Sequence, residues 1–471
     1  MNGSNRYIIE KQFIELKLES AVDVFDFRNE LEEVCKNELI PEIEKLFDNI
    51  IPGDKLIRLD YLEIDAGKIS ADAWKKEFVD NVIRKISAAV DTLPNEGIIS
   101  RDRTGALINE DENAENVFLF FLEKGFLPWY SGIDRKSELN TLADELMNNY
   151  NDIFLKRLKY LLKNKKKSLN RLIFQFDEKI LNRISEQLFS EKDQEGILRI
   201  LNSTLSSLNF NSEQKKILIY GNWFEVLMNE KYKEKEDALF TEICNGILSS
   251  SEIEKYPEHK IKFVKNVSEH LKNNNDPEVF LKPLTEDIPV KDSKTDSESE
   301  PAYVAEYYIN NSGLVLIHPF LVKLFENNGY TENGEWVSEK HQQRAIALMQ
   351  YAVTGKEEYP EFLLMLNKIL CGYEISDSLP ADIVLSEFEK NEADELLSSV
   401  IGHWTALKKT TVNGLQETFL IRNGKLRHDT GGWILIVEVN TADILINKLP
   451  WGISIIKLPW MKEMMRVEWS Y

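Results

Sequence analysis

The stretch Leu449-Pro-Trp-Gly-Ile-Ser-Ile-Ile-Lys-Leu-Pro-Trp460 holds two copies of Leu-Pro-Trp, nine positions apart. Proline sets its own φ at about −65° and biases the residue before it toward extended geometry. We therefore expect two rigid corners, each of which aims an indole, Trp451 and Trp460. A tightly packed core is the favoured interpretation of these indoles, and stacking on a sugar or another ligand is the alternative.

The residues before this stretch carry strand and turn signals. Phe419-Leu-Ile-Arg leads into Asn423-Gly424, a dipeptide typical of β-hairpin turns. The apolar run from Trp433 to Val439 follows, and Thr441 is placed to cap a short helix through Leu449. Together these signals predict a β-rich C-terminal module over residues 413–471.

Composition limits the class of protein. The chain has 471 residues and a hydrophobic content of 43%, which is enough for several packed domains. Its net charge of −21 should repel nucleic acid phosphates and anionic lipids. No apolar run reaches the ~20 residues of a membrane helix, and no secretory signal is visible. Three widely spaced cysteines favour a reducing compartment. We expect a cytoplasmic protein with no nucleic acid partner and no membrane insertion.

The N-terminal residues 1–93 are predicted to form an α+β domain. Residues 7–19 alternate between apolar and polar side chains, as a half-buried strand does. A helix should follow and kink or restart at Pro41. A second strand is expected from Leu56 to Asp65, and a second helix from Trp74 to Val90 after a cap at Ser70. Residues 94–114 are predicted to form a polar loop.

The rest of the chain is predicted to be mainly helical, which gives an α+β, mainly α, fold class. Residues 115–281 form a helical middle region. Its basic cluster around 156–167 is interpreted as a solvated helix end rather than a grip on an acidic partner. Residues 282–302 should form a disordered acidic linker, because they have too little apolar surface to offset chain entropy. Residues 303–412 are predicted to be a helical domain.

No pattern of a catalytic or metal site stands out. The histidines lack the spacing of a zinc helix, and no Cys-x-x-Cys, phosphate-binding loop or nucleophile elbow is present. Asp60, Glu63 and Asp65 are interpreted as an exposed acidic strand face rather than a Ca²⁺ or Mg²⁺ site. His318 and His403 are interpreted as core histidines. The sequence therefore predicts no catalytic residues, no metal, no cofactor and no enzymatic activity.

Several multi-residue motifs nevertheless occur in a distinctive order. They are Ile9-Glu10-Lys11-Gln12, the segment from Leu56 to Gly67, Gly125-Phe-Leu-Pro-Trp-Tyr130, Asn311-Ser-Gly-Leu-Val-Leu-Ile-His-Pro-Phe-Leu321, Leu366-Asn-Lys-Ile-Leu-Cys-Gly372, Ile401-Gly-His-Trp404, Gly414-Leu-Gln-Glu-Thr-Phe-Leu420, the Leu449–Met461 stretch and Val467-Glu-Trp469. In these motifs the chain resembles the contractile injection system tape measure proteins of bacterial phage-tail-like particles. The resemblance covers roughly 7–130 and 305–470.

The resemblance implies a structural protein that sets the length of the inner tube and sheath during particle assembly on a baseplate. It implies contacts with inner tube, baseplate or other particle subunits, in the bacterial cytoplasm during assembly or within the assembled particle. The matched motifs would then be packing and docking elements. The side chains expected to interact are Trp129, Tyr130, His318, Trp404, Trp451, Trp460 and Trp469.

Three hypotheses follow for the mechanism. A ruler could have compact terminal domains, with only the middle and the linker able to stretch. An assembly adaptor of the baseplate or cap could instead dock tube subunits without measuring length. A third alternative is an effector enzyme carried in the lumen.

Overall fold

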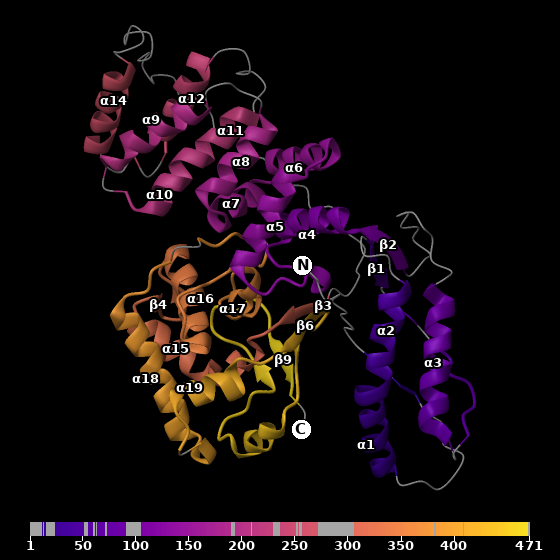
Figure 1. Cartoon of the computed structure of the whole chain (residues 1–471). Helices are drawn as coiled ribbons and strands as arrows, with labels where there is room; N and C mark the ends of the chain where they lie inside the picture. Colours follow the sequence, from indigo (N-terminus) through magenta and orange to yellow (C-terminus); the bar gives the residue numbers. More distant parts are fainter. Residues whose placement is uncertain are drawn as a thin grey trace. The chain divides into compact units, whose positions relative to one another are not determined.

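The computed structural model describes residues 12, 14–15, 24–50, 55–59, 62, 64–70, 73–90, 105–189, 194–208, 210–228, 236–250, 253, 257–271, 306–380, 383–407 and 409–469. The chain divides into two compact units, Met1–Val117 and Phe118–Tyr471 (Figure 1). Helices dominate the described residues, and a mixed sheet lies near the C-terminus. The predicted class, α+β and mainly α, is confirmed. The finer five-part division of the chain stays a prediction.

In the smaller unit, one long helical segment packs against a second helix. The elements are α1 (Val24–Val34), the π-helical turn η1 (Cys35–Leu39), α2 (Ile40–Ile50) and α3 (Trp74–Val90). The helix continues through Pro41, and the wider π turn lies directly before it, where such a turn absorbs a disturbed hydrogen-bond ladder. The core of this unit is apolar and contains Val34, Leu39, Ile43, Phe78, Val79 and Ile86.

A short two-stranded sheet completes this unit. β1 (Lys55–Leu59) pairs antiparallel with β2 (Gly105–Asn109), and Ile57 lies opposite Leu107. The sequence placed residues 94–114 in a polar loop, so β2 is a correction: the apolar triplet Ala106-Leu-Ile108 was too short a signal beside its polar neighbours. The strand predicted over 7–19 lies mostly outside the described residues, as do Asp60 and Glu63. Asp65 accepts a hydrogen bond from the backbone of Gly67 at 2.8 Å.

The larger unit begins with a layer of helices. α4 (Glu110–Lys124) starts in the smaller unit and ends in the larger one. The next elements are η3 (Trp129–Ser131), α5 (Lys136–Asn148), α6 (Asp152–Asn164), α7 (Lys166–Gln175), α8 (Glu178–Leu188), α9 (Gln194–Ser206), α10 (Ser212–Lys216), η4 (Ile217–Gly221), α11 (Asn222–Met228), α12 (Glu236–Leu248) and α14 (Pro257–Leu271). Each long helix buries an apolar stripe, as α6 does with Phe154, Leu158 and Leu162.

The C-terminal part of the larger unit combines helices with a five-stranded sheet. Its elements are β3 (Glu306–Ile309), η7 (Ser312–Ile317), α15 (His318–Asn327), β4 (Thr331–Glu332), β5 (Glu335–Trp336), α16 (Glu339–Thr354), η8 (Glu361–Leu363), α17 (Met365–Leu370), α18 (Glu387–His403), η9 (Thr405–Leu407), α19 (Val412–Leu415), η10 (Gln416–Leu420), β6 (Gly424–Asp429), β7 (Gly432–Val437), η11 (Thr441–Lys448), β8 (Ile455–Ile456) and β9 (Met465–Glu468). The strand order is β3-β6-β7-β9-β8. β7 lies at the centre, antiparallel to β6 and parallel to β9.

The hairpin forms one strand later than the sequence predicted. Its turn falls between Asp429 and Gly432, whereas Gly424 is the first residue of β6. Gly424 is needed for close packing: a Cβ there would lie 2.5 Å from the Cβ of Ser312. The Ser312 hydroxyl lies 2.8 Å from the carbonyl oxygen of Arg422. Gly424 therefore serves close packing against Ser312, although the dipeptide Asn423-Gly424 had indicated a turn.

The two Leu-Pro-Trp corners direct their indoles into the chain's own core. The Trp451 indole donates to the carbonyl of Leu316 at 2.9 Å, and the Trp460 indole donates to the carbonyl of Leu370 at 2.8 Å. The short helix expected between β7 and these corners is the 3-10 helix η11, and Asn440 rather than Thr441 caps it through a bond from Ala442. The corners therefore tie the C-terminal stretch back onto η7 and α17.

Candidate docking site

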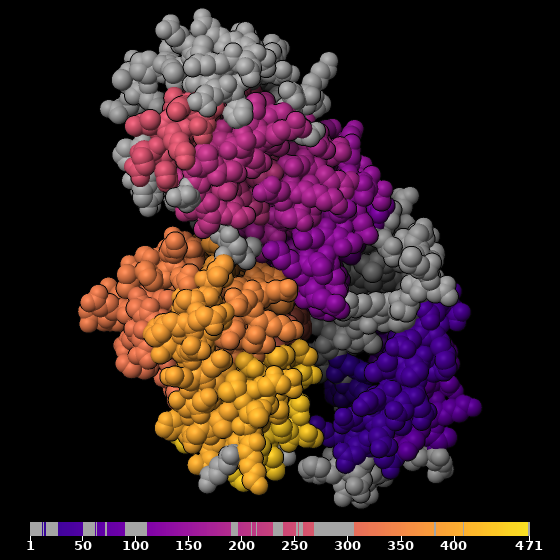
Figure 2. Space-filling model, turned by 60° about the vertical axis from the view of Figure 1, so that its left-hand side comes forward, coloured from indigo at the N-terminus to yellow at the C-terminus, as the bar shows by residue number. Residues whose placement is uncertain are grey.

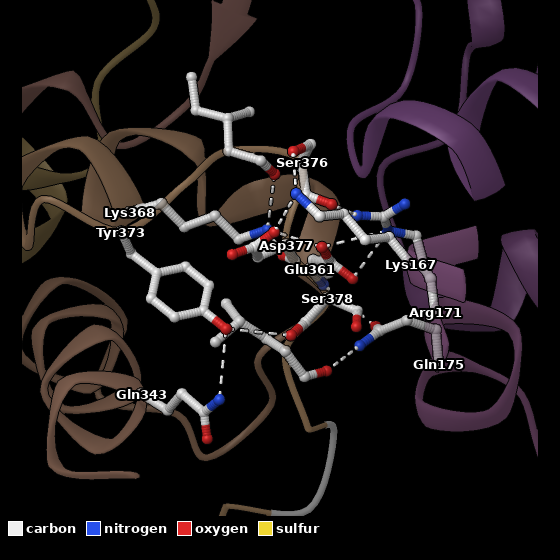
Figure 3. A network of polar contacts seen from close by, with 12 residues as sticks. Lys167, Arg171, Gln175, Gln343, Glu361, Lys368, Tyr373, Ser376, Asp377 and Ser378 are labelled. Carbon is white, nitrogen blue, oxygen red and sulfur yellow. Dashed lines mark hydrogen bonds and ion pairs between the residues drawn. The ribbon is translucent and has the colours of Figure 1, made fainter. Parts of the chain in front are cut away.

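A buried ionic network joins the helical layer to the C-terminal part of the larger unit (Figure 3). Arg171 lies on α7, Glu361 on η8 and Lys368 on α17. The Arg171 and Glu361 side chains are 0% exposed and that of Lys368 is 1% exposed. Residues 190 positions apart in the sequence thus meet inside the protein.

Two cations share one carboxylate at the centre of this network. The Arg171 Nε atom lies 3.2 and 3.1 Å from the two oxygens of Glu361. The Lys368 Nζ atom lies 2.6 Å from Glu361 Oε1. Glu361 therefore balances only one of two positive charges, and the excess charge must be stabilised by other polar groups.

Backbone carbonyls supply that stabilisation on the arginine side. Arg171 Nη1 donates to the carbonyl of Leu122 at 2.5 Å, at the C-terminal end of α4. Its Nη2 donates to the carbonyl of Ser376 at 2.7 Å. Free carbonyls at a helix C-terminus carry partial negative charge, which suits a cation. One guanidinium therefore holds α4, α7 and the loop after α17 together.

Backbone carbonyls also stabilise the charge of the Lys368 side chain. Lys368 Nζ donates to the carbonyls of Ile375 at 3.0 Å and Asp377 at 2.7 Å. Burial lowers the pKa of Lys368, and the attraction of Glu361 opposes this lowering. The ammonium is thus placed where its charge is costly and where these acceptors are oriented toward it.

Further contacts extend the network to the surface. Gln175 donates to the carbonyl of Leu379 at 2.7 Å and accepts from the backbone of Glu361 at 3.2 Å. Lys167, which is exposed, lies 2.5 Å from Asp377 Oδ1. Lys167, Arg171 and Gln175 occupy one face of α7, since they are spaced four positions apart.

Gly125 makes room for this network. Its φ is +86°, and a Cβ at this position would lie 2.7 Å from Arg171 Nη2 and 2.8 Å from Glu361 Oε1. Such an approach is closer than side chains tolerate, and a positive φ also favours glycine. The glycine of the Gly125–Tyr130 motif therefore lets α4 end against the ion pair.

Only indirect signals in the sequence point to these residues. Arg171 and Lys368 are the charged residues of two mainly apolar segments, 169–176 and 365–370. A charge inside an apolar stripe is a signal for a buried pair, but its partner cannot be read from a sequence separation of this size.

The predicted interaction residues all make contacts within the chain. Trp404 is 0% exposed and donates to the carbonyl of Leu445 at 3.1 Å. Trp469 donates to Asp443 Oδ2 at 3.0 Å. Trp129 and Tyr130 are half-buried and meet edge to face, with ring centroids 5.6 Å apart.

His318 is half-buried, with its Nδ1 2.9 Å from the carbonyl oxygen of Val315. Burial lowers its pKa, against the effect of that hydrogen bond. The structure pairs Trp460 with Trp336, at 4.9 Å between centroids, and does not bring the seven predicted residues together. Their contacts with other subunits stay a prediction.

Among the described residues, no three His, Cys, Asp or Glu side chains are grouped so that they could hold a metal ion. No helix in the same part of the chain is both long and apolar enough to span a membrane.

The fold is mainly helical, and a buried ionic network joins segments that are far apart in the sequence. A family model described as contractile injection system tape measure protein matches residues 6–469, and the chain belongs to this family. No curated protein and no solved structure matches the chain. The resemblance seen in the motifs is thereby confirmed over nearly the whole length. The chain is a structural, tape-measure component of such a particle, and the match does not favour the adaptor and luminal-enzyme alternatives.

Proposed function

We propose that this tape measure protein consists of an anchoring body and a measuring span, and that it performs no catalytic step. The observation that supports the anchoring body is the Arg171–Glu361–Lys368 network. It joins α7 to the C-terminal part through side chains that are almost fully removed from water. In the space-filling view the helical layer that contains α7 lies against the C-terminal part of the larger unit (Figure 2).

An ionic dock suits an anchor because it selects one arrangement. Replacing a buried ion pair by apolar side chains often leaves stability unchanged, whereas removing one partner is strongly destabilising. The network therefore adds little to stability in total but penalises any other placement of α7. We propose that this placement is what inner tube or baseplate subunits contact during assembly in the bacterial cytoplasm.

The helices from α9 onward are the proposed span. Within this part, α14 packs on the end of α9, where Asn266 donates to the Ser207 hydroxyl at 2.6 Å and Lys262 donates to the Ser207 carbonyl at 2.5 Å. None of these contacts involves the residues of the ionic network. Because η4 and α11 pack against α7 and α6, we expect only helices beyond α11 to be removable or duplicable without altering the dock.

A change in particle length tests this proposal. Residues 236–271 comprise α12 and α14. As one continuous helix they would span about 54 Å, at ~1.5 Å per residue. As two packed layers they would contribute about 20 Å, at roughly 10 Å per helix. The experiment deletes these residues in one strain and duplicates them in tandem in another, and particle length is measured by electron microscopy.

The expected result is shorter particles after the deletion and longer particles after the duplication, by equal amounts. A change of about 54 Å in particle length means that the span is extended in the particle. A change of about 20 Å means that its helices stay stacked. The length-preserving variant Ile261→Ala, at a side chain that is 72% exposed, is the control and should leave the length distribution unchanged. Unchanged length in both the deletion and the duplication strain would refute the span.

A further inference from the structure

α6 presents a basic face that lies outside the ionic network and outside the proposed measuring span. Residues 153–167 contain seven basic and no acidic side chains, in a chain whose net charge is −21. Ile153 and Tyr160 are 69% and 70% exposed, and Lys156 and Lys163 are also exposed. Their spacing of three, four and three residues puts all four on one side of the helix.

This side of α6 faces outward because the opposite side is committed to the core. Phe154, Leu158 and Leu162 are buried there. Neighbouring charges are paired, since Lys165 lies 2.5 Å from Glu123 and Lys167 pairs with Asp377. Within the described part of the chain, Lys156 and Lys163 have no such partner. Two large exposed apolar side chains alternate with these two lysines along the helix, and such a surface suits an acidic, partly apolar counterpart.

α18 presents a face of that kind. Phe388 is 57% exposed, Val384 just before the helix is 72% exposed, and Glu387, Asp394 and Glu395 are exposed or partly exposed as well. Glu387 forms a surface pair with Lys390 at 2.5 Å. Among the described residues neither Asp394 nor Glu395 has a cationic partner.

The two faces match in spacing as well as in charge. Lys156 and Lys163 are two helical turns apart, and so are Glu387 and Asp394, which puts about 10.5 Å between the members of each pair. Antiparallel contact of the helices would set each lysine against an acid, with Tyr160 near Phe388. Figure 1 shows α6 and α18 well apart in the larger unit, so the two faces of one copy do not meet.

We propose that the α6 face of one copy docks on the α18 face of a second copy. The contact is heterologous, because each copy uses a different face, so it continues from copy to copy unless a ring closes. Two helix faces of this size give a small, charge-dependent interface. We expect a dissociation constant of roughly 10 µM at low salt, and we expect it to rise at least about tenfold in ~0.5 M salt. The interface does not depend on the measuring span.

Sedimentation velocity of the full chain with two charge-reversal variants tests the proposal. The first variant is Lys156→Glu with Lys163→Glu, and the second is Glu387→Lys with Asp394→Lys. Each variant alone puts like charges on both faces and should remain monomeric. An equimolar mixture should associate again, because every contact between the two variants joins opposite charges.

The matched control is Lys340→Glu with Lys409→Glu, which changes the net charge as the first variant does but lies outside both faces. It should associate as the unaltered chain does. Circular dichroism of each variant verifies that the fold is retained. The proposal is overturned if the unaltered chain is monomeric in low salt at about 100 µM, which is roughly ten times the expected dissociation constant. It is also overturned if the mixture of the two variants fails to associate.

A basic face with an exposed aromatic side chain could also bind nucleic acid, and fluorescence anisotropy with a short DNA duplex tests this alternative. No binding is expected. If the duplex binds, and binding disappears in Lys156→Glu with Lys163→Glu while the chain alone stays monomeric, the face binds nucleic acid and the proposed self-association is wrong.

Discussion

Removing the charges of the buried network one at a time should destabilise the docking of α7 in a definite order. Glu361→Gln leaves two buried cations without a carboxylate and should cost the most, about 5 kcal/mol. Arg171→Met keeps the pair of Glu361 with Lys368 but leaves two carbonyls without their donor. We expect about 3 kcal/mol for this change, at the lower end of the range for a broken buried pair.

Lys368→Met should be the mildest of the three changes. It preserves the two contacts between Arg171 and Glu361, at 3.2 and 3.1 Å, and it removes a cation whose charged form burial already disfavours. The lost hydrogen bonds to two carbonyls should still cost about 1–3 kcal/mol.

Hydrogen exchange of peptides from α7 is the appropriate assay, because a chain with two compact units need not unfold in one step. A loss of ~3 kcal/mol should accelerate exchange there more than about 100-fold, at tenfold per ~1.4 kcal/mol. Peptides from α3, in the smaller unit, serve as the internal reference.

The matched control is Lys179→Met on α8. This lysine is 71% exposed and pairs with Asp144 at 3.4 Å, so its loss should cost less than about 1 kcal/mol. The reasoning is refuted if Glu361→Gln accelerates α7 exchange no more than Lys368→Met does, or if neither differs from the control.

Four further predictions follow from the same structure. Gly125→Ala should destabilise the larger unit by about 1–3 kcal/mol, measured by exchange of α4 and α7, because φ is +86° and the new methyl group meets Arg171; a neutral outcome would contradict this. The pKa of Lys368 lies below its ordinary 10.5, so stability should rise as pH increases through that lowered value toward 10.5, and urea midpoints of Lys368→Met should lack this rise. Burial opposes ionisation of Glu389, but hydrogen bonds, above all from Arg344, lower its pKa from 4.5 to about 2; stability should therefore fall as pH drops from 4.5 to 2, and less steeply in Glu389→Gln. Trp404→Phe should cost about 1–3 kcal/mol in thermal unfolding, because the Leu445 carbonyl loses its donor, and an unchanged melting temperature would count against this.

Local patterns in the sequence were sufficient for the helical stripes and for the apolar central strand. The stripe of α6 and the run from Trp433 to Val437 could be predicted because period and burial are properties of neighbouring residues. The Leu-Pro-Trp corners also behave as expected, since proline acts on the residue next to it. Composition and motif order were enough to indicate the family.

Tertiary structure decided which distant residues meet. Asn423-Gly424 resembled a turn, yet packing against Ser312 makes Gly424 the start of a strand. The strand β2 became recognisable only through its pairing with β1. The ionic network has the same cause: Arg171 and Glu361 are 190 positions apart, and a charge in an apolar stripe specifies that a partner is needed but not where the chain supplies it.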